Sequence, residues 1–192
     1  MIGRIMWAPT QAKEIPNGNY SKLRENRWGV MLHYDASGSD AGAVAWFGDP
    51  RCRVSYQLLV LDDGSFVRIA PDDRRAWHAG RCKTSDSERL RYKDANSALY
   101  GIAIASSGRH GVEPLQLLTM AFLVRRYFER HGWDIAETWR IVGHNTEATP
   151  RGRKTDPEGS DPTNPILSVN HIRQLMPRVE VPAMSSPLEG TP

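Results

Sequence analysis

Blocks of apolar residues alternate with polar segments along the chain, and their lengths predict strands and helices in turn. Residues 28–33 and 100–105 are short apolar runs typical of buried strands. Residues 54–61 and 65–70 are also strand-like, and the Asp62-Asp63-Gly64 sequence between them is typical of a hairpin turn. These runs predict a β-sheet that contains an antiparallel pair.

Helical spacing occurs in segments between the strands. Ser39 can cap a short helix that extends to Phe47 and ends at Gly48. From Pro114 onward the apolar residues recur at helical spacing, and Gly132 is a typical stop signal. These signals predict one short helix and one long helix.

The remaining pattern completes the predicted architecture. Residues 139–143 are expected to form another strand, and residues 168–175 a last short helix. Strands interleaved with helices, together with a hairpin, are typical of the α/β class. We therefore expect a single domain with a central mixed β-sheet flanked by helices.

Several stretches lie outside this regular pattern. Residues 1–27 are polar and are expected to form an irregular N-terminal arm, so that residues 28–176 make up the folded domain. Residues 177–192 are rich in Pro, Ser and Glu and are expected to be a disordered tail. Within the domain, residues 84–96 and 145–165 are expected to be loops.

Composition and charge narrow the class of protein. The 192 residues fit one domain, and 40% of them are apolar, which is an ordinary globular balance. No apolar run approaches the roughly 20 residues that span a bilayer, so we expect no stable membrane association. The net charge is +3, but the basic residues are spread among acidic ones, which argues against a nucleic-acid-binding protein. The first residues lack the apolar stretch of a secretory signal, so we expect a cytoplasmic product.

The two cysteines do not form a metal-binding pair. Cys52 and Cys82 are far apart and neither belongs to a C-x-x-C motif, which excludes a structural zinc finger. They could form one disulfide if the fold joined them. Cytoplasmic proteins keep their thiols reduced, so we expect two free cysteines.

Two of the six histidines stand where a site would form. His33 and His144 each follow an apolar strand-like run directly, so both side chains are expected at strand ends. His131, at the end of the predicted long helix, is expected to have a structural role. Asp156 and Glu147, in the loop after His144, are both possible carboxylate ligands. Two imidazoles, one carboxylate and an open position are typical of catalytic zinc.

A cation stands close to this possible site. Lys154 precedes Asp156 by two residues. A positive side chain beside a metal is unusual unless it faces developing negative charge, as in the oxyanion of amide hydrolysis. The pattern favours a hydrolase.

Five short motifs in order resemble a known family. They are 30–34 (Val-Met-Leu-His-Tyr), 54–58 (Val-Ser-Tyr-Gln-Leu), 77–80 (Trp-His-Ala-Gly), 100–102 (Tyr-Gly-Ile), and 143–144 (Gly-His) with 154–157 (Lys-Thr-Asp-Pro). Together they resemble the zinc-dependent N-acetylmuramoyl-L-alanine amidases of type 2, which share the peptidoglycan-recognition-protein fold with phage endolysins. The resemblance covers about residues 29–160. It implies a catalytic domain that hydrolyses the amide bond between N-acetylmuramic acid and L-alanine in peptidoglycan.

The resemblance also implies roles for single residues. His33, His144 and Asp156 match the three ligands of one Zn²⁺ ion. Tyr56 matches the tyrosine that assists catalysis in the phage branch, and Lys154 matches the catalytic lysine placed two residues before the last ligand. The substrate-binding residues would be Trp77 and His78, which fall where the family lines its substrate groove.

Two positions depart from the family pattern. Gln57 stands where many members have His, and Ala103 stands where the cytosolic recycling branch carries Glu. The second departure favours a lytic, endolysin-type enzyme. Cytosolic recycling of muropeptides, and a module that binds peptidoglycan without cutting it, remain alternatives.

The resemblance has consequences for partners as well. The expected partners are peptidoglycan or muropeptides, with no nucleic acid, and the expected state is a monomer. A lytic enzyme made in the cytoplasm would reach the cell wall after release through a holin-type pore.

Overall fold

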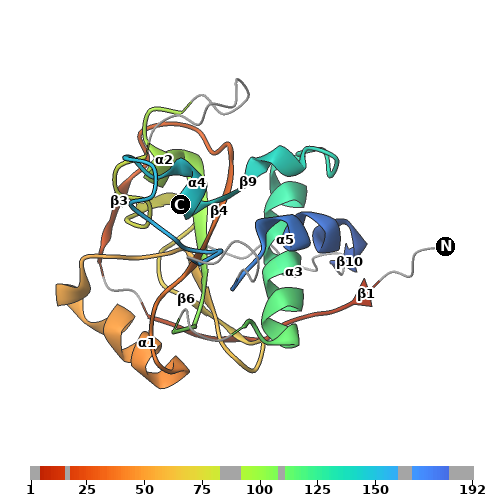
Figure 1. Cartoon of the computed structure of the whole chain (residues 1–192), viewed down its shortest axis with the longest axis horizontal. Coiled ribbons are helices and arrows are strands. Elements are labelled where there is room, and N and C mark those ends of the chain that lie inside the picture. The colour runs from red at the N-terminus through yellow and green to blue at the C-terminus, as the bar shows by residue number, and fades with distance from the viewer. Residues whose placement is uncertain (1–4, 16–17, 83–91, 108–110, 160–165, 182–192) are drawn as a thin grey trace.

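The centre of the molecule is a six-stranded mixed sheet with the strand order β2-β6-β5-β8-β4-β9 (Figure 1). This computed structural model describes residues 5–15, 18–82, 92–107, 111–159 and 166–181. All neighbours pair in parallel except β5 and β6, which form the antiparallel hairpin predicted around Asp62-Asp63-Gly64. The six strands are β2 (Gln11–Glu14), β4 (Gly29–Tyr34), β5 (Leu58–Val60), β6 (Phe66–Arg68), β8 (Leu99–Ile104) and β9 (Ile141–Gly143). The prediction of a mixed α/β sheet is confirmed.

Two small sheets and the helices surround this sheet. In the small sheets β1 (Ile5–Met6) pairs with β10 (Val179–Glu180), and β3 (Tyr20–Lys22) pairs with β7 (Arg74–Ala76). The α-helices are α1 (Asp40–Gly48), α2 (Ala95–Ala98), α3 (Pro114–His131), α4 (His144–Glu147) and α5 (Val169–Leu175). The described residues also form the short 3-10 helices η1 (Pro50–Cys52), η2 (Thr138–Arg140) and η3 (Met176–Arg178). No helix in the described part of the chain is both long and apolar enough to cross a membrane.

The predicted helices begin and end at the expected residues. The side chain of Ser39 caps α1 by accepting a hydrogen bond from the Gly42 N–H, 3.1 Å away. Helix α3 begins at Pro114 and ends at His131, and the capping residue Gly132 has a φ of 62°, the left-handed conformation that favours glycine. Local capping chemistry therefore sets the lengths of both helices.

Apolar side chains alternate between the two faces of the sheet. Leu58 and Val60 point into the core beneath α3 and α5, whereas Leu59 points into a second core beneath α1. Figure 1 shows α3 and α5 side by side on one side of the molecule and α1 at the opposite end. Strands β4, β5, β8 and β9 are buried on both faces, which explains why their sequences are mostly apolar.

The predicted irregular N-terminal arm is wrong for much of residues 1–27, because three strands form there. Strand β2 is the outer strand of the central sheet and pairs with β6. Its sequence, Gln-Ala-Lys-Glu, has no apolar alternation because the strand is largely exposed. Backbone hydrogen bonds hold it in place, and these leave no signal in the side-chain pattern.

Other boundaries also differ from the prediction. The strand expected at 54–61 is shortened to β5, and the loop expected at 145–165 begins with the short helix α4. Part of the predicted tail, Val179–Glu180, is ordered as β10, and residues 182–192 lie outside the described residues. Most of the loop expected at 84–96 is also outside them, and its last residues begin α2.

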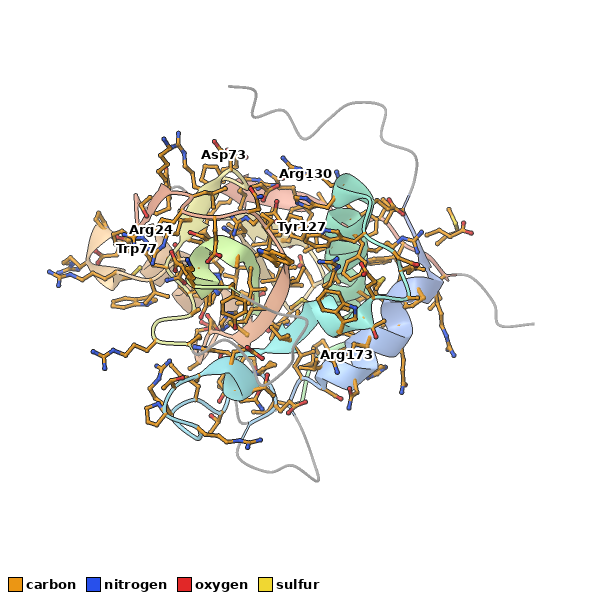
Figure 2. The ribbon with its side chains drawn as sticks, turned by 90° about the horizontal axis from the view of Figure 1, so that it is seen from above. Arg24, Asp73, Trp77, Tyr127, Arg130 and Arg173 are labelled. Atoms are coloured by element: carbon orange, nitrogen blue, oxygen red, sulfur yellow. The ribbon has the colours of Figure 1, made fainter. Side chains whose placement is uncertain are left out.

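A buried carboxylate joins the sheet to α3. Asp72 accepts hydrogen bonds from Arg68 (2.9 Å), from the Tyr127 hydroxyl (2.7 Å) and from Arg130 (2.6 Å). Figure 2 shows Tyr127 and Arg130 on α3, near the surface residue Asp73. Because Asp72 is almost fully buried, these three donors replace the water that its charge would otherwise need.

Candidate metal centre and its cavity

Two adjacent parallel strands place His33 and His144 side by side. In the register of β4 and β9, Leu32 is the partner of Gly143, so the next residues of both strands lie at the same level. The two imidazole ring centroids are 4.7 Å apart. The prediction that both histidines stand at strand ends is confirmed, since His33 is near the end of β4 and His144 directly follows β9.

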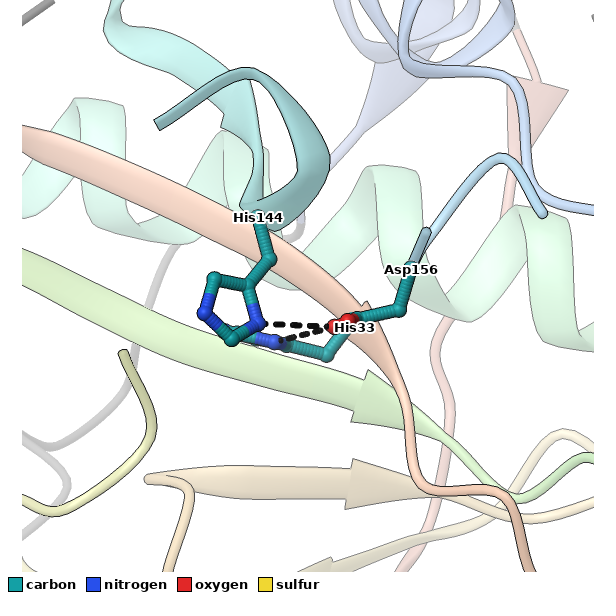
Figure 3. A group of neighbouring side chains, drawn as sticks. All are labelled: His33, His144 and Asp156. Atoms are coloured by element: carbon teal, nitrogen blue, oxygen red, sulfur yellow. Dashed lines mark hydrogen bonds and ion pairs between the residues drawn. The ribbon is translucent and has the colours of Figure 1, made fainter. Parts of the chain in front are cut away.

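Asp156 reaches the histidines from the loop that follows α4. Its Oδ2 atom lies 2.8 Å from Nδ1 of His33 and 3.0 Å from Nδ1 of His144 (Figure 3). The loop is tied down where the Asn145 N–H donates to the Asp156 carbonyl oxygen at 2.7 Å. It also packs tightly, because a Cβ atom at Gly143 would come within 3.0 Å of Pro157 Cδ.

The three side chains form a compact, buried group of possible metal ligands. One ligand atom from each of His33, His144 and Asp156 lies within 4.8 Å of the others. Their exposed fractions are 0%, 2% and 8%. Burial lowers the pKa of His33 to about 4, so this ring is neutral at neutral pH. Burial acts to raise the pKa of Asp156, but the contacts with His144 and His33 outweigh it and hold this pKa well below its usual range.

The far nitrogens of both histidines are engaged outside the group. Nε2 of His144 lies 2.8 Å from the carbonyl oxygen of Ala79, and Nε2 of His33 lies 3.1 Å from Nδ1 of His78. A carbonyl oxygen only accepts hydrogen bonds, so Nε2 of His144 donates to Ala79, and Nδ1 of His144 is turned toward Asp156. The Nδ1 atoms of both histidines thus face one carboxylate oxygen, as the nitrogen and oxygen ligands of a single metal ion would.

The alternative carboxylate, Glu147, is directed elsewhere. It is buried and accepts a hydrogen bond of 2.5 Å from the hydroxyl of Tyr92. It is absent from the metal-binding group found among the described residues. Asp156 is therefore the carboxylate that the fold brings to the histidines.

Tyr56 and Lys154 lie beside this group. The Tyr56 ring is 4.9 Å from the His33 ring, and Phe47 of α1 packs against its other side. Burial raises the pKa of Tyr56 well above its usual value, so its hydroxyl is a hydrogen-bond donor at neutral pH. Neither the Tyr56 hydroxyl nor the Lys154 ammonium makes a hydrogen bond within the described part of the chain. Both donors remain available to a substrate.

The group opens into a cavity of about 570 Å³. Tyr56, His144, Lys154 and Asp156 line it, so two of the possible ligands and the two donors face one space, whereas His33 is fully buried. The wall also contains Trp46, Arg53, Trp77, His78 and Arg153. Figure 2 shows Trp77 near one end of the molecule, well apart from Arg173 of α5. A cavity of this size can hold a drug-sized ligand or one segment of a polymer.

Two predicted wall residues differ in their surroundings. Trp77 is half-buried at the wall, and its indole N–H lies 3.5 Å from the Ser21 hydroxyl. His78 is buried beneath His33 and has little surface to offer. Trp46 and Arg53 were not predicted, because an isolated Trp in a short helix and an isolated Arg in a loop leave no sequence signal.

The two departures from the family pattern have clear positions. Ala103 is the register partner of His33 in β8, so no carboxylate stands beside His33 on that strand. The Gln57 side chain accepts from the Gly101 N–H (2.7 Å) and donates to the Arg74 carbonyl oxygen (3.0 Å). Gln57 thus fastens β7 to the central sheet.

Comparison with known proteins adds independent information. A family model described as N-acetylmuramoyl-L-alanine amidase matches residues 24–159. The chain is 26% identical over 150 residues to N-acetylmuramoyl-L-alanine amidase A of Achromobacter lyticus, which covers 76% of this chain and 73% of that protein. It is 32% identical over 105 residues to 1,6-anhydro-N-acetylmuramyl-L-alanine amidase AmpD of Escherichia coli (strain K12), which covers 55% of this chain and 52% of that protein.

Solved structures agree on the fold. The crystal structure of a selenomethionine derivative of AmpD aligns with a TM-score of 0.65 and 23% sequence identity. The alignment covers 91% of this chain and 99% of that chain. The predicted fold is confirmed.

Proposed function

The chain belongs to the N-acetylmuramoyl-L-alanine amidase family and is an amidase, and we propose that it uses zinc to hydrolyse the bond between N-acetylmuramic acid and L-alanine in peptidoglycan. The observation that carries the zinc proposal is the convergence of two imidazoles and one carboxylate on a single point, with the two Nδ1 atoms facing one carboxylate oxygen. Two histidines and one carboxylate are a common ligand set of catalytic zinc.

The three proposed ligands leave one coordination position of a tetrahedral zinc ion open for water or substrate. His33, His144 and Asp156 supply three ligands, and the cavity lies on the open side of the group. When bound, zinc supplies a Lewis acid that polarises a carbonyl group and lowers the pKa of bound water to about 7. The buried position of the three ligands limits competition from bulk water.

Two side chains are placed to stabilise the oxyanion of amide hydrolysis. We propose that Tyr56 and Lys154 donate hydrogen bonds to the oxygen of the scissile carbonyl as negative charge develops there. The Tyr56 hydroxyl keeps its proton because burial raises its pKa, and Lys154 brings a positive charge to the cavity mouth. One such donor lowers a barrier by roughly 3 to 4 kcal/mol in comparable oxyanion sites.

The walls of the cavity suit a peptide that carries carboxylates. Arg53 and Arg153 are exposed basic residues of the wall, and Trp77 offers an aromatic face. Peptidoglycan stem peptides carry free carboxylates, which arginine binds with paired hydrogen bonds. We propose that Trp77 and these two arginines bind the peptide next to the bond that is cleaved.

We propose that the natural substrate is intact cell wall, so that the enzyme is lytic. Support comes from Ala103, which leaves no carboxylate beside His33 on β8, and from Tyr56, which matches the tyrosine of the endolysin-type branch. A lytic enzyme of this kind would act after release, through a holin-type pore.

A second candidate is the trimming of soluble muropeptides in the cytoplasm. The observation that favours it is the 32% identity to AmpD, whose name gives an anhydromuramyl substrate. The chemistry would be the same, and only the size of the substrate would differ.

One experiment tests the reaction and separates the two substrates. The protein is incubated with purified cell-wall sacculi and, separately, with soluble anhydromuropeptides, each with and without EDTA. Mass spectrometry should detect free stem peptides that begin with L-alanine, and EDTA should abolish them. Release from sacculi supports the lytic role, release from soluble fragments alone supports recycling, and EDTA-resistant release would refute the zinc proposal.

A further inference from the structure

His78 lies directly behind one of the proposed zinc ligands. It follows Trp77 after β7, and its ring meets the His33 ring edge-on, with 5.1 Å between the centroids and 81° between the planes. Only 6% of the residue is exposed, so its ring has little contact with the cavity. A role through His33 therefore fits its position better than direct binding of substrate.

A chain of hydrogen bonds sets which ring nitrogen carries the proton. Nε2 of His78 lies 3.2 Å from the carbonyl oxygen of Leu99, which can only accept, so this nitrogen carries a proton. Nδ1 of the neutral His78 ring is then an acceptor. It lies 3.1 Å from Nε2 of His33, which must donate to it.

The consequence reaches the proposed metal site. Because Nε2 of neutral His33 carries the ring proton, Nδ1 of His33 has a free lone pair. Nδ1 is the atom that faces Asp156 Oδ2 at 2.8 Å. The hydrogen bond between His33 Nε2 and His78 Nδ1 thus leaves Nδ1 of His33 as the nitrogen that can bind the metal.

Ala79, the residue after His78, orients the second proposed ligand, His144, in a similar way. The Ala79 carbonyl oxygen accepts from Nε2 of His144 at 2.8 Å, and this contact turns Nδ1 of His144 toward Asp156. Two consecutive residues, His78 and Ala79, therefore fix the ring protons of both histidine ligands.

The backbone of this pair is held firmly. The Asn96 side-chain oxygen accepts from the His78 N–H (2.9 Å) and from the Ala79 N–H (2.7 Å). The His78 ring packs against Gly101 of β8, where an added Cβ atom would lie 2.6 Å from the ring. Only glycine at position 101 leaves space for this ring.

We infer that His78 is a positioning residue for zinc: it holds the Nε2 proton of His33 and so makes Nδ1 of His33 the ligand atom. This inference rests on the proposed zinc-dependent function. Partners of metal-bound histidines commonly contribute about 10- to 100-fold to metal affinity.

The test compares zinc affinity among variants of the metal-free protein, by competition with a chromophoric chelator. His78→Phe removes the acceptor and should weaken zinc binding about 10- to 100-fold. His78→Gln keeps a side-chain oxygen that can accept, and should recover part of the loss. His131→Phe is the matched control, because His131 also bonds to a buried partner, the Tyr100 hydroxyl, but lines a different cavity, together with Arg27 and Asp72. It should bind zinc like the unchanged protein.

A second measurement does not depend on whether the variants fold. Nitrogen-15 NMR of the zinc-loaded unchanged protein should show a proton on Nε2 of His33 and metal coordination at Nδ1. The opposite assignment, or equal zinc affinity of His78→Phe and the unchanged protein, would overturn the inference. Failure of the unchanged protein to bind zinc at all would instead refute the proposed function.

Discussion

His33 and His144 are separated by 110 intervening residues in the chain, yet they stand one residue beyond a register pair of neighbouring strands, Leu32 and Gly143. Strand pairing alone brings their rings to a centroid distance of 4.7 Å. The site therefore depends on the correct register of β4 and β9, since a shift of one residue would turn one histidine to the other face of the sheet.

Removing a proposed ligand should remove the metal. His33→Ala is expected to lose bound zinc and amidase activity together, because two ligands rarely hold catalytic zinc. Zinc content by elemental analysis and stem-peptide release by mass spectrometry check this. His171→Ala, at an exposed position on α5, is the control and should keep both. Stoichiometric zinc in His33→Ala would contradict the ligand assignment.

Removing an oxyanion donor should spare the metal. Tyr56→Phe and Lys154→Ala are each expected to keep one zinc ion and to lower kcat by about 10²- to 10³-fold, because each removes one hydrogen bond made as charge develops. Turnover on a purified muropeptide, measured beside zinc content, checks the prediction. Full activity in both variants would reject these roles.

The buried carboxylate at Asp72 should matter for stability. Asp72→Asn weakens three hydrogen bonds and leaves the largely buried Arg68 with only the exposed Glu14, 3.7 Å away, as counter-charge, so the free energy of unfolding is expected to fall by about 3 kcal/mol. Denaturant unfolding measures the change. Asp73→Asn, one residue away and exposed, should change it by less than about 0.5 kcal/mol. Similar losses of unfolding free energy in Asp72→Asn and Asp73→Asn would contradict the stabilising role assigned to Asp72.

The thiol of Cys82 should be unreactive at ordinary pH. Burial raises the pKa of this thiol to about 12, and it is free of any disulfide. At pH 8 alkylation by iodoacetamide should therefore be much slower in the folded protein than in urea, because the thiolate is the reactive form. Peptide mapping after timed alkylation gives the rate.

The pH dependence of Cys82 has a definite sign. The folded protein keeps this proton up to about pH 12, whereas an unfolded thiol releases it near its ordinary pKa. The unfolded state then binds fewer protons, so this group lowers stability as pH rises from about 9 toward 12. Fast alkylation of Cys82 at pH 8 in the folded state would show that its pKa is not raised.

The sequence predicted those parts of the fold that have a side-chain pattern. The apolar strands β4 and β8 and the capped helix α3 were expected from residue type alone, and His33 and His144 were expected at strand ends. Strand β2 was missed because an exposed edge strand has no apolar alternation, and its partner lies about 50 residues away.

The surroundings of the site were harder to predict than its centre. The motif containing His78 suggested a groove residue, but its ring lies beneath His33, and only the packing against Gly101 reveals this. The role of Asn96 depends on backbone N–H groups 17 and 18 positions away, which no local pattern specifies.

The proposed ligands come from residues 33, 144 and 156, so an ion bound to them would link early and late parts of the chain. The unfolded chain has no comparable site, and free metal would therefore shift the folding equilibrium. At a free concentration about 100 times Kd, the gain would be about 2.7 kcal/mol. The melting temperature would then rise with the concentration of free metal. Removal of the metal by a chelator would increase the unfolded fraction and so make the protein more sensitive to proteolysis, even with every catalytic side chain unchanged.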